Sequence, residues 1–417
     1  MAVFHLNLSL NVLTMKPNFL NSYLDYAQGN EASPLFHLWA GINVLSCVVS
    51  RRIFFSQEYF KIYPNMYVVL VGEPGDKKTT AMSLAREMVQ KMDRPIAPPS
   101  ATKEAITVLM SAENDKSKCH INYLDGTLPK HITHLSFFAS EIVTMLSAGG
   151  NPQGIIEFFT DIYDREAFEV LTKNKGNDVI NAPYITILAC MTPEQTGQLL
   201  KERLITGGFS RRCVFIYGRS KAEPVPRPKL LPAQIASKIF CMEHLQKVKE
   251  YKCEYKMSDC GEAFFDKWYR MKHRQLSMPH PAPFKNWLRS KDTMLIKLAM
   301  LLDLSEDMTG ILTSEILSRG VDMLDATEKD LNRVFAGAGK NPLAELAFKV
   351  ISKLEEAPNH RLSKKQLLAA LFEDGDLDQI DKAIAFLTTT DQIVRGTISH
   401  PTVVEVLALK KSDPDQP

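Results

Sequence analysis

The sequence predicts an α/β protein in which helices cover both faces of a parallel sheet. Strand candidates at residues 66–71, 135–139, 184–190 and 213–217 are short and almost continuously apolar, as expected of strands buried on both faces. Helix candidates at 79–92, 102–111 and 193–203 alternate with them, which is typical of parallel strands joined by helical crossovers. The 417 residues carry 50 basic and 48 acidic side chains, an ordinary globular composition for two or three domains.

Changes of pattern divide the chain into four parts. Residues 1–60 have helical periodicity and form an N-terminal helical segment, and residues 61–220 hold the alternating strands and helices. After a proline-rich linker at 221–232, residues 233–335 are again helical and are expected to form a lid-like subdomain. Residues 341–410 predict three helices followed by a hairpin, the order of a winged helix.

Several protein classes are excluded. No apolar run reaches the ~18–20 residues that span a bilayer, so no membrane partner is expected. Seven scattered cysteines without a CxxC pair indicate reduced thiols in a cytoplasmic protein rather than a disulfide or zinc framework. Residues 1–14 have no basic residue before their apolar stretch and make a poor signal peptide. They are either an extension upstream of Met15 or an edge strand.

A glycine-containing turn between a strand and a helix is the strongest local signal. Backbone N–H groups of such a turn, with the positive end of the helix, hold nucleotide phosphates. Lys78 is expected to reach the β- and γ-phosphates and Thr79 to bind Mg²⁺. The common motif has glycine before the lysine, where this chain has Lys77; the alternative is a plain strand–turn–helix. The predicted ATP-binding residues are Gly72, Glu73, Pro74, Gly75, Asp76, Lys77, Lys78, Thr79 and Thr80.

Two further strands end in residues suited to ATP hydrolysis. The strand at 135–139 runs into Ser140 and Glu141, so Glu141 is the predicted base that activates water, with Ser140 beside it on the metal side. A buried strand capped by a helix-starting serine is the alternative. Thr192 follows the strand at 184–190, and it either senses the γ-phosphate or caps the next helix.

Basic residues supply the remaining candidates. Arg211 and Arg212 precede the strand at 213–217 and suit an arginine finger that reaches a neighbouring subunit's ATP, Arg211 slightly ahead; a solvated basic loop is the alternative. Residues 167–180 predict a hairpin whose tip carries Lys173 and Lys175. Around a six-fold ring these lysines would contact single-stranded DNA, unless the tip is merely solvated.

Two further charged regions are weaker candidates for contact with DNA, which Lys364, Lys365 and Arg395 at one end of the winged helix could still make. A cluster at 267–274 lies on a predicted helix whose aromatic side is expected in the core and whose basic side in solvent; it comprises Lys267, Arg270, Lys272, His273 and Arg274. Residues 342–417 hold 9 basic and 12 acidic residues, so the winged helix has a net negative charge that disfavours binding in a groove of DNA. We expect it to pack on the ring or to bind a replication protein.

Six stretches between residues 18 and 335 together resemble a known family. They are FHLWAGINVLSCVVSRRIFF, YPNMYVVLVGEPGDKKTTA, FFASE, ITILACMTPE, GGFSRRCVFIYG and WLRSKDTMLIKLAMLLDL. They are similar to primase/helicase-like P-loop ATPases of phages, plasmids and integrated mobile elements, relatives of the AAA+ ring helicases. In that family the glycine before the lysine is commonly replaced, often by a basic residue. The resemblance implies an AAA+/RecA-like fold, a homo-oligomeric ring, expected to be a hexamer, and action on DNA.

Two functions follow from these features. The first is a DNA-dependent ring ATPase, a replicative helicase of a phage or mobile element that moves on single-stranded DNA. The alternative is an ATP-binding switch or adaptor, such as a helicase loader or replication regulator, with weak or no hydrolysis. Lys77 and Ser140 favour the switch, whereas Glu141 with the two arginines favours the motor, because a pure switch has no need of a finger in trans.

Overall fold

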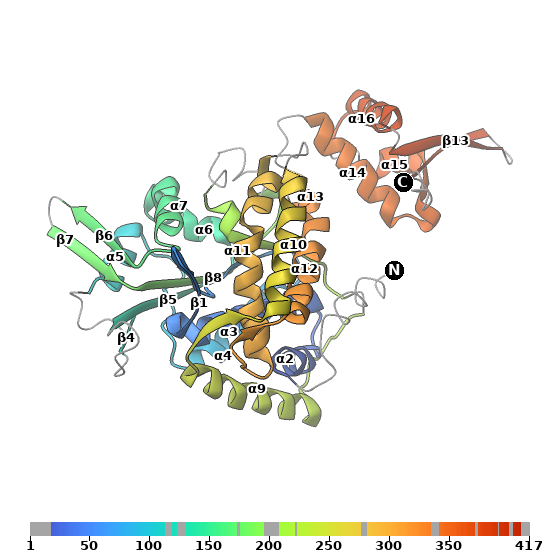
Figure 1. Ribbon diagram of the computed structural model, residues 1–417. Helices are drawn as coiled ribbons and strands as arrows, with labels where there is room; N and C mark the ends of the chain where they lie inside the picture. The colour runs from blue at the N-terminus through green and yellow to red at the C-terminus, as the bar shows by residue number, and fades with distance from the viewer. Residues whose placement is uncertain are drawn as a thin grey trace. The chain divides into compact units, whose positions relative to one another are not determined.

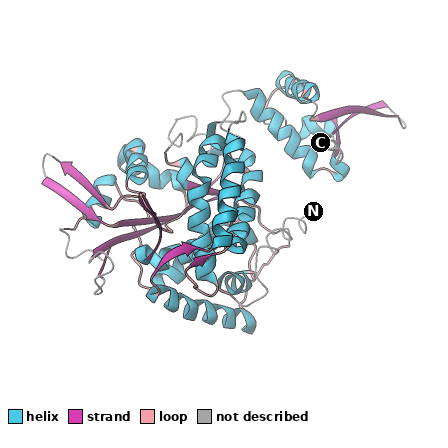
Figure 2. Ribbon diagram, viewed as in Figure 1, coloured by secondary structure: helices cyan, strands magenta, loops and turns pink. Residues whose placement is uncertain are grey.

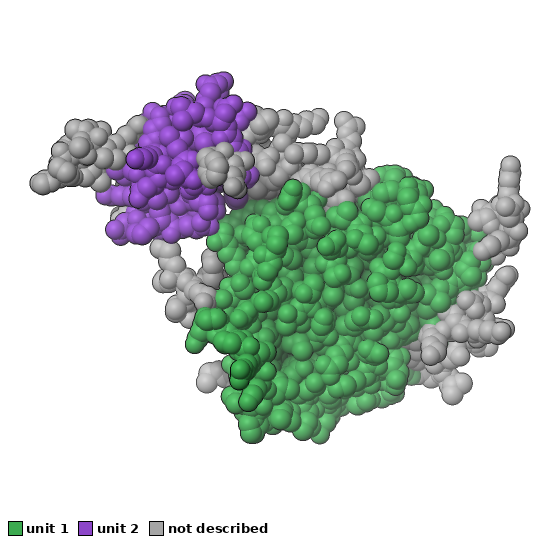
Figure 3. Space-filling model, turned by 180° about the vertical axis from the view of Figure 1, so that it is seen from behind, with its two compact units in different colours: residues 1–334 green, residues 335–417 purple. Residues whose placement is uncertain are grey.

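The chain folds into two compact units, residues 1–334 and residues 335–417 (Figure 3). The structure is a computed structural model, and it describes residues 18–112, 119–122, 131–172, 176–195, 208–221, 223–276, 282–334, 342–371, 374–390, 392–399 and 403–409.

A five-stranded sheet forms the centre of the first unit (Figure 1). Its order is β4 (His120–Asn122), β5 (His131–Ala139), β8 (Pro183–Met191), β3 (Tyr67–Val71) and β9 (Cys213–Tyr217). Four of the strands are parallel, and only β4 runs antiparallel to its neighbour. Every residue of β3, β8 and β9 is buried. The predicted α/β sheet and its four parallel strands are therefore confirmed.

Helices of the first half of the chain pack on this sheet, except that α2 packs on α3 and α9 (Figure 2). They are α2 (Phe19–Ala27), α3 (Pro34–Val49), α4 (Lys78–Lys91), α5 (Lys103–Met110), α6 (Ile142–Leu146) and α7 (Pro152–Asp161). Three of them begin at the N-cap side chains Asn18, Thr102 and Asn151, each of which accepts a backbone N–H of the first turn. Helix α3 is buried on nearly every side, which explains its apolar composition.

A second sheet was not predicted. It has the order β11 (Ile311–Leu312), β10 (Cys253–Met257), β1 (Ile53–Gln57) and β2 (Phe60–Ile62), with β1 parallel to β10. The sequence had suggested helix throughout the regions that contain these strands. The strands are two to five residues long, and β1 pairs with residues about 200 positions away, Ile53 with Cys253. Local periodicity over so few residues does not distinguish strand from helix.

A helical layer completes the first unit. It contains α9 (Pro232–Glu250), α10 (Asp259–Leu276), α11 (Ala282–Ser305), α12 (Ser314–Lys329) and α13 (Leu331–Val334). Trp268 of α10 is buried, as predicted for the aromatic side of that helix. Lys272, which the sequence placed in solvent, is 4% exposed and forms an ion pair with Asp292 of α11. That expectation was wrong because the partner carboxylate lies on another helix.

The predicted hairpin at 167–180 is present as the antiparallel strands β6 (Ala167–Thr172) and β7 (Gly176–Asn181). Its tip residues Lys173 and Lys175 lie outside the described residues.

The second unit has its own apolar core. Its elements are α14 (Pro342–Glu356), β12 (Arg361–Ser363), α15 (Lys364–Leu371), α16 (Leu377–Thr389), β13 (Ile393–Ser399) and β14 (Val403–Leu409), with an antiparallel sheet of order β12–β14–β13. The core is built from side chains such as Val350, Leu367 and Ile384. Asp376, one of the acidic residues of this unit, caps α16 through a capping box with Gln379.

All seven cysteines are free thiols. Among the described residues, no helix is both long and apolar enough to cross a membrane.

Candidate nucleotide site

The strand register brings the predicted site residues to one edge of the central sheet. Val71 of β3 pairs with Met191 of β8 and with Tyr217 of β9, while Ala139 of β5 pairs with Ala189 of β8. The loop after Val71, Thr192 and Glu141 therefore leave the sheet at nearly the same level. In parallel sheets, ligands bind outside this carboxyl edge.

Strand β8 lies between the loop-bearing strand β3 and the strand β5 that leads to Glu141. Neighbouring strands are about 4.8 Å apart, so the β3 and β5 backbones are separated by about 10 Å. That spacing leaves room for a terminal phosphate and a water molecule between the loop and Glu141.

The loop between β3 and α4 has the backbone that close approach of phosphates requires. Gly75 has φ +93°, and a side chain there would meet no atom within 4 Å. Lys77 has φ 56°, in the left-handed region that favours glycine. Lys77 stands where the common motif has glycine, and a lysine holds this left-handed conformation at a cost of about 1–2 kcal/mol.

Lys78 lies over the loop. Its Nζ donates to the carbonyl oxygens of Gly72 at 2.6 Å and Glu73 at 2.7 Å. Partial burial lowers the pKa of this ammonium, while nearby Asp76 acts in the opposite direction. An ammonium has three donors, so Lys78 can contact a phosphate oxygen while it remains attached to the loop.

The side chain of Asp76 stabilises the loop through hydrogen bonds to backbone groups. Its carboxylate accepts the backbone N–H of Glu73 at 2.7 Å and that of Ser220 at 2.9 Å. Ser220 follows β9, so this side chain ties the loop to the neighbouring strand end. The sequence placed Asp76 among the nucleotide contacts, but its buried carboxylate is engaged with backbone groups of the protein.

A second carboxylate, Glu31, links the loop to the proline-rich linker. Its side chain pairs with Lys77 at 3.3 Å and accepts the backbone N–H of Val225 at 2.9 Å. These hydrogen bonds, that of Val225 before that of Lys77, lower the pKa of Glu31. Sequence reasoning missed Glu31, because it lies in the turn between α2 and α3 and carries no local motif.

The predicted magnesium residues are accessible. Thr79, Ser140 and Glu141 are all exposed at the carboxyl edge. Among the described residues, no group of three His, Cys, Asp or Glu side chains could hold a metal alone. This arrangement suits Mg²⁺, which is usually bound by one or two protein oxygens together with substrate phosphates.

Thr192 has the geometry of a helix N-cap. Its hydroxyl accepts the backbone N–H of Gln195 at 3.3 Å, and Gln195 Oε1 accepts the N–H of Thr192 at 3.0 Å. This supports the capping alternative.

The two predicted finger arginines lie at the opposite edge of the sheet. They precede Cys213, which pairs with Tyr67 at the start of β3. At ~3.3 Å per residue, Tyr67 lies about 13 Å from Val71, where β3 ends and the loop begins. Arg212 is half-buried and donates to the Gly208 carbonyl at 2.8 Å. Arg211 is exposed and forms no ion pair with the residues that the structure describes. The structure therefore favours Arg211 over Arg212 for a contact with another molecule.

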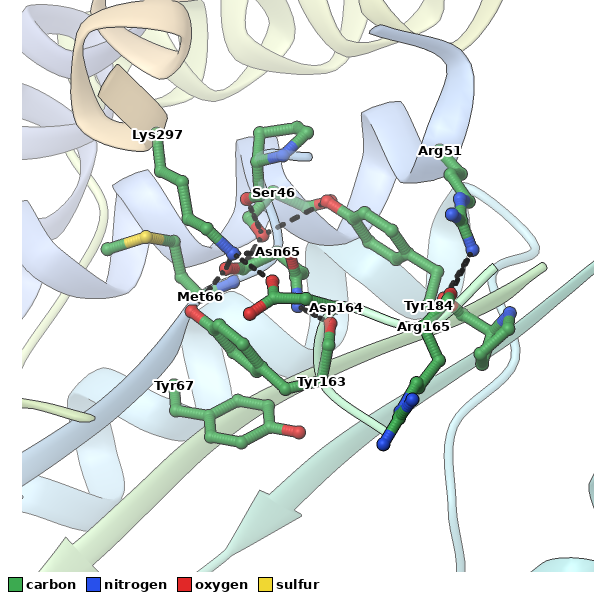
Figure 4. Close-up of polar contacts among 12 residues, drawn as sticks. Ser46, Arg51, Asn65, Met66, Tyr67, Tyr163, Asp164, Arg165, Tyr184 and Lys297 are labelled. Carbon is green, nitrogen blue, oxygen red and sulfur yellow. Dashed lines mark hydrogen bonds and ion pairs between the residues drawn. The ribbon is translucent and has the colours of Figure 1, made fainter. Parts of the chain in front are cut away.

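A buried lysine lies at this same amino edge (Figure 4). Lys297 of α11 is fully buried, and its Nζ donates to Asn65 Oδ1 at 2.7 Å, pairs with Asp164 at 3.4 Å and lies 3.9 Å from the centre of the Tyr163 ring. Burial lowers the pKa of Lys297 to about 8, although Asp164 opposes the shift. A lysine within the apolar stripe of a helix was the sequence signal for this site, and it was missed.

Arg51 anchors the neighbouring chain segment. Its guanidinium donates to the carbonyl oxygens of Arg165 at 2.9 Å and Pro183 at 3.1 Å, and it pairs with Glu166 at 2.7 Å. Asp164, Arg165 and Glu166 immediately precede β6, so Lys297 and Arg51 together hold the base of the β6–β7 hairpin.

A small apolar cavity of about 40 Å³ lies between helices and a strand of the first unit. It is lined by side chains of α3, β9 and α12, among them Trp39, Tyr217 and Met323. Burial raises the pKa of Asp322 at the cavity wall.

The sequence was compared with known protein-family models and with curated proteins, and it matches neither.

Proposed function

We propose that the chain is a DNA-dependent ATPase that works as a homo-oligomeric ring, in agreement with the family resemblance of its sequence. One observation carries the proposal: Lys78, Glu141 and Thr192 come from three adjacent parallel strands and leave the sheet at the same edge. A plain strand–turn–helix would not require an exposed carboxylate two strands away.

We further propose which fold family each of the two units belongs to. The first unit is assigned as a P-loop NTPase domain of AAA+/RecA-like type, and the second as a winged helix, on the order of its helices and hairpin.

The residues have the following roles in the proposed reaction. Backbone N–H groups of Gly75, Lys77, Lys78 and Thr79, together with the Lys78 ammonium, hold the phosphates of ATP, and Thr79 with Ser140 supports Mg²⁺. Glu141 orients a water molecule and accepts its proton. Arg211 reaches the ATP of an adjacent subunit, because its own loop lies at the far edge of the sheet.

The proposed binding of DNA is based on the β6–β7 hairpin, and the proposed motor function is based on the family resemblance of the sequence. We propose that Lys173 and Lys175 contact single-stranded DNA, and that the acidic second unit binds protein. The motor is a replicative helicase of a phage or mobile element. The ATP-binding switch remains the second candidate, because the strained Lys77 and the serine at position 140 are departures from an efficient ATPase.

The test compares ATP hydrolysis by the wild type and by Glu141→Gln, each with and without single-stranded DNA at low and moderate salt. We expect DNA to stimulate the wild type and the variant to lose turnover by about 100-fold or more, because a general base contributes about 10²–10⁴. ATP binding should survive.

Glu157→Gln, an exposed carboxylate on α7, is the matched control and should turn over normally. Tight ATP binding by a wild type that never hydrolyses it, with or without DNA, would replace the motor with the switch.

A further inference from the structure

We infer that the outer face of the C-terminal half of α10 is a second contact surface for nucleic acid, distinct from the β6–β7 hairpin. The inference rests on the proposed function for its ligand class, a phosphodiester backbone. Three observations support the inference: the positive charge of residues on α10 and the start of α11, the exposure of their side chains, and the ion pairs that some of them form and others do not.

The sequence from Asp266 to Asp292 has an unusual charge pattern for a nearly neutral chain. The 25 residues between these two carboxylates contain seven Lys and Arg and no acidic residue. Two of the seven are neutralised in the fold: Lys272 pairs with Asp292, and Lys291 pairs with Asp325 and with Glu328. The other cations have no such structural role.

Three of the remaining cations share one face of α10. At 100° per residue, Lys267, Arg270 and Arg274 lie within about 60° of one another around the helix axis and span about 10 Å along it. All three are exposed, and none forms an ion pair with a residue of the described part of the chain. Arg289 of α11 is a further exposed cation beyond the same end of α10.

The opposite face of α10 is fixed to the protein. It packs against α11 and α12, with Trp268 and Lys272 buried there. Figure 1 shows α10 at the front of the helical layer, beside these two helices. The cationic face is therefore held on a rigid element, and its geometry does not depend on a loop.

The contact is expected to be with phosphates and not with bases. The aromatic neighbour Tyr269 is 37% exposed, but Lys272 Nζ lies 4.8 Å from its ring centre and the Phe265 ring stacks at 6.0 Å. A ring engaged in this way offers little surface for base stacking. Three cations spaced over ~10 Å match about three successive phosphates of one strand, without sequence preference.

The experiment measures how salt affects binding of fluorescent oligonucleotides to the full chain. In the triple variant Lys267→Gln, Arg270→Gln, Arg274→Gln, we expect the slope of log affinity against log salt to fall by about 2, since each lost contact to a single strand removes ~0.7. The loss should be equal for oligo-dT and for mixed sequence. Duplex DNA and RNA probes identify which nucleic acid the face prefers.

Two matched variants separate charge from folding. The charge-retaining variant Lys267→Arg, Arg270→Lys, Arg274→Lys should restore the wild-type slope. The variant Arg227→Gln, Lys229→Gln, Lys247→Gln removes the same charge from other exposed positions and should also keep it.

The outcomes are distinguishable. If the wild type binds DNA and the α10 variant keeps the wild-type slope, the inference is overturned while the proposed function stands. A wild type that binds no nucleic acid even at low salt overturns both. If the α10 variant loses only its binding of a poly-glutamate peptide, the face binds protein and the inference fails.

Discussion

The side chain of Asp76 holds the loop between β3 and α4 in shape, so in the proposed function it would support nucleotide binding without touching the nucleotide. Its carboxylate holds two backbone N–H groups, one in the loop and one after β9. Hydrogen bonds to a charged group are worth about 1.5–3 kcal/mol each. We therefore predict that Asp76→Ala weakens ATP binding by about tenfold, equivalent to ~1.4 kcal/mol, measured by titration with a fluorescent ATP analogue.

The control for this prediction is the neighbouring Glu73→Ala. The Glu73 side chain is exposed, and only the backbone of that residue takes part in the contacts described. Its affinity for ATP should stay within about twofold of the wild type. Equal losses of ATP affinity in the two variants would show that binding depends on the net charge of the loop and not on the hydrogen bonds that Asp76 accepts.

Lys297 makes a residue-scale prediction about pH. Its pKa in the folded chain is about 8, below the ordinary 10.5 of the unfolded chain. Between pH 8 and pH 10.5, Lys297 binds more protons in the unfolded state than in the folded state. The contribution of Lys297 to the free energy of unfolding therefore increases as the pH rises through this range. Below pH 8 the group is charged in both states, and its contribution is constant.

The measurement is the free energy of unfolding in urea for the wild type and Lys297→Met at pH 7.5 and 9.5. The variant isolates the lysine, because burial raises the pKa values of several thiols, such as that of Cys47 to about 11, and these act in the opposite direction in both proteins. The difference should move in favour of the wild type by about 2 kcal/mol. A constant difference would show that Lys297 titrates normally.

At the scale of elements, the turn between α11 and β11 depends on one buried carboxylate. Asp303 is 1% exposed and accepts the Tyr255 hydroxyl at 2.8 Å, the Thr309 hydroxyl at 2.7 Å and the Gly310 N–H at 3.0 Å. It thereby joins β10 to the turn that leads into β11. Asp303→Ala would remove the acceptor of the buried Gly310 N–H and leave the Tyr255 hydroxyl only the more distant carbonyl oxygen of Met300, at 3.5 Å.

We predict that Asp303→Ala lowers the free energy of unfolding by about 3 kcal/mol or more, because unsatisfied buried donors cost about 1–3 kcal/mol each. Urea titration followed by tryptophan fluorescence measures it. Asp307→Ala, four residues along in the same turn region, should change stability by less than about 0.5 kcal/mol. A similar loss in both variants would contradict the role given to Asp303.

The elements that could be predicted from sequence are those with long or continuous local patterns. All four parallel strands of the central sheet and the three helices and hairpin of the second unit fall within a few residues of their predicted places. The second sheet was not predictable, since β1 and β10 are short and meet only in the tertiary fold.

The same distinction applies to the site. Gly72, Lys78 and Glu141 follow from spacing along the chain, and the backbone of Lys77 explains why glycine is common there. The roles of Glu31, Asp76, Arg51 and Lys297 depend on contacts between segments distant in sequence. No local motif could have assigned them.

At the scale of the whole molecule, the proposed function gives the two edges of the central sheet different tasks. The carboxyl edge carries the nucleotide loop, and the amino edge carries Arg211 and the anchored base of the β6–β7 hairpin. Arg211 cannot complete the site of its own chain from that edge. The proposed reaction then requires a head-to-tail assembly, in which one subunit's amino edge meets the next subunit's loop.

This requirement is tested by mixing two inactive variants. Arg211→Ala lacks the finger but has an intact loop and Glu141, while Glu141→Gln lacks the base but has the finger. In randomly mixed rings about a quarter of the interfaces combine the intact parts of both, so hydrolysis should return to about a quarter of the wild-type rate. Mixing Arg211→Ala with Lys78→Ala should give the same recovery. If mixtures stay as inactive as the separate variants although they assemble, Arg211 does not act across the subunit boundary, and the amino edge serves DNA alone.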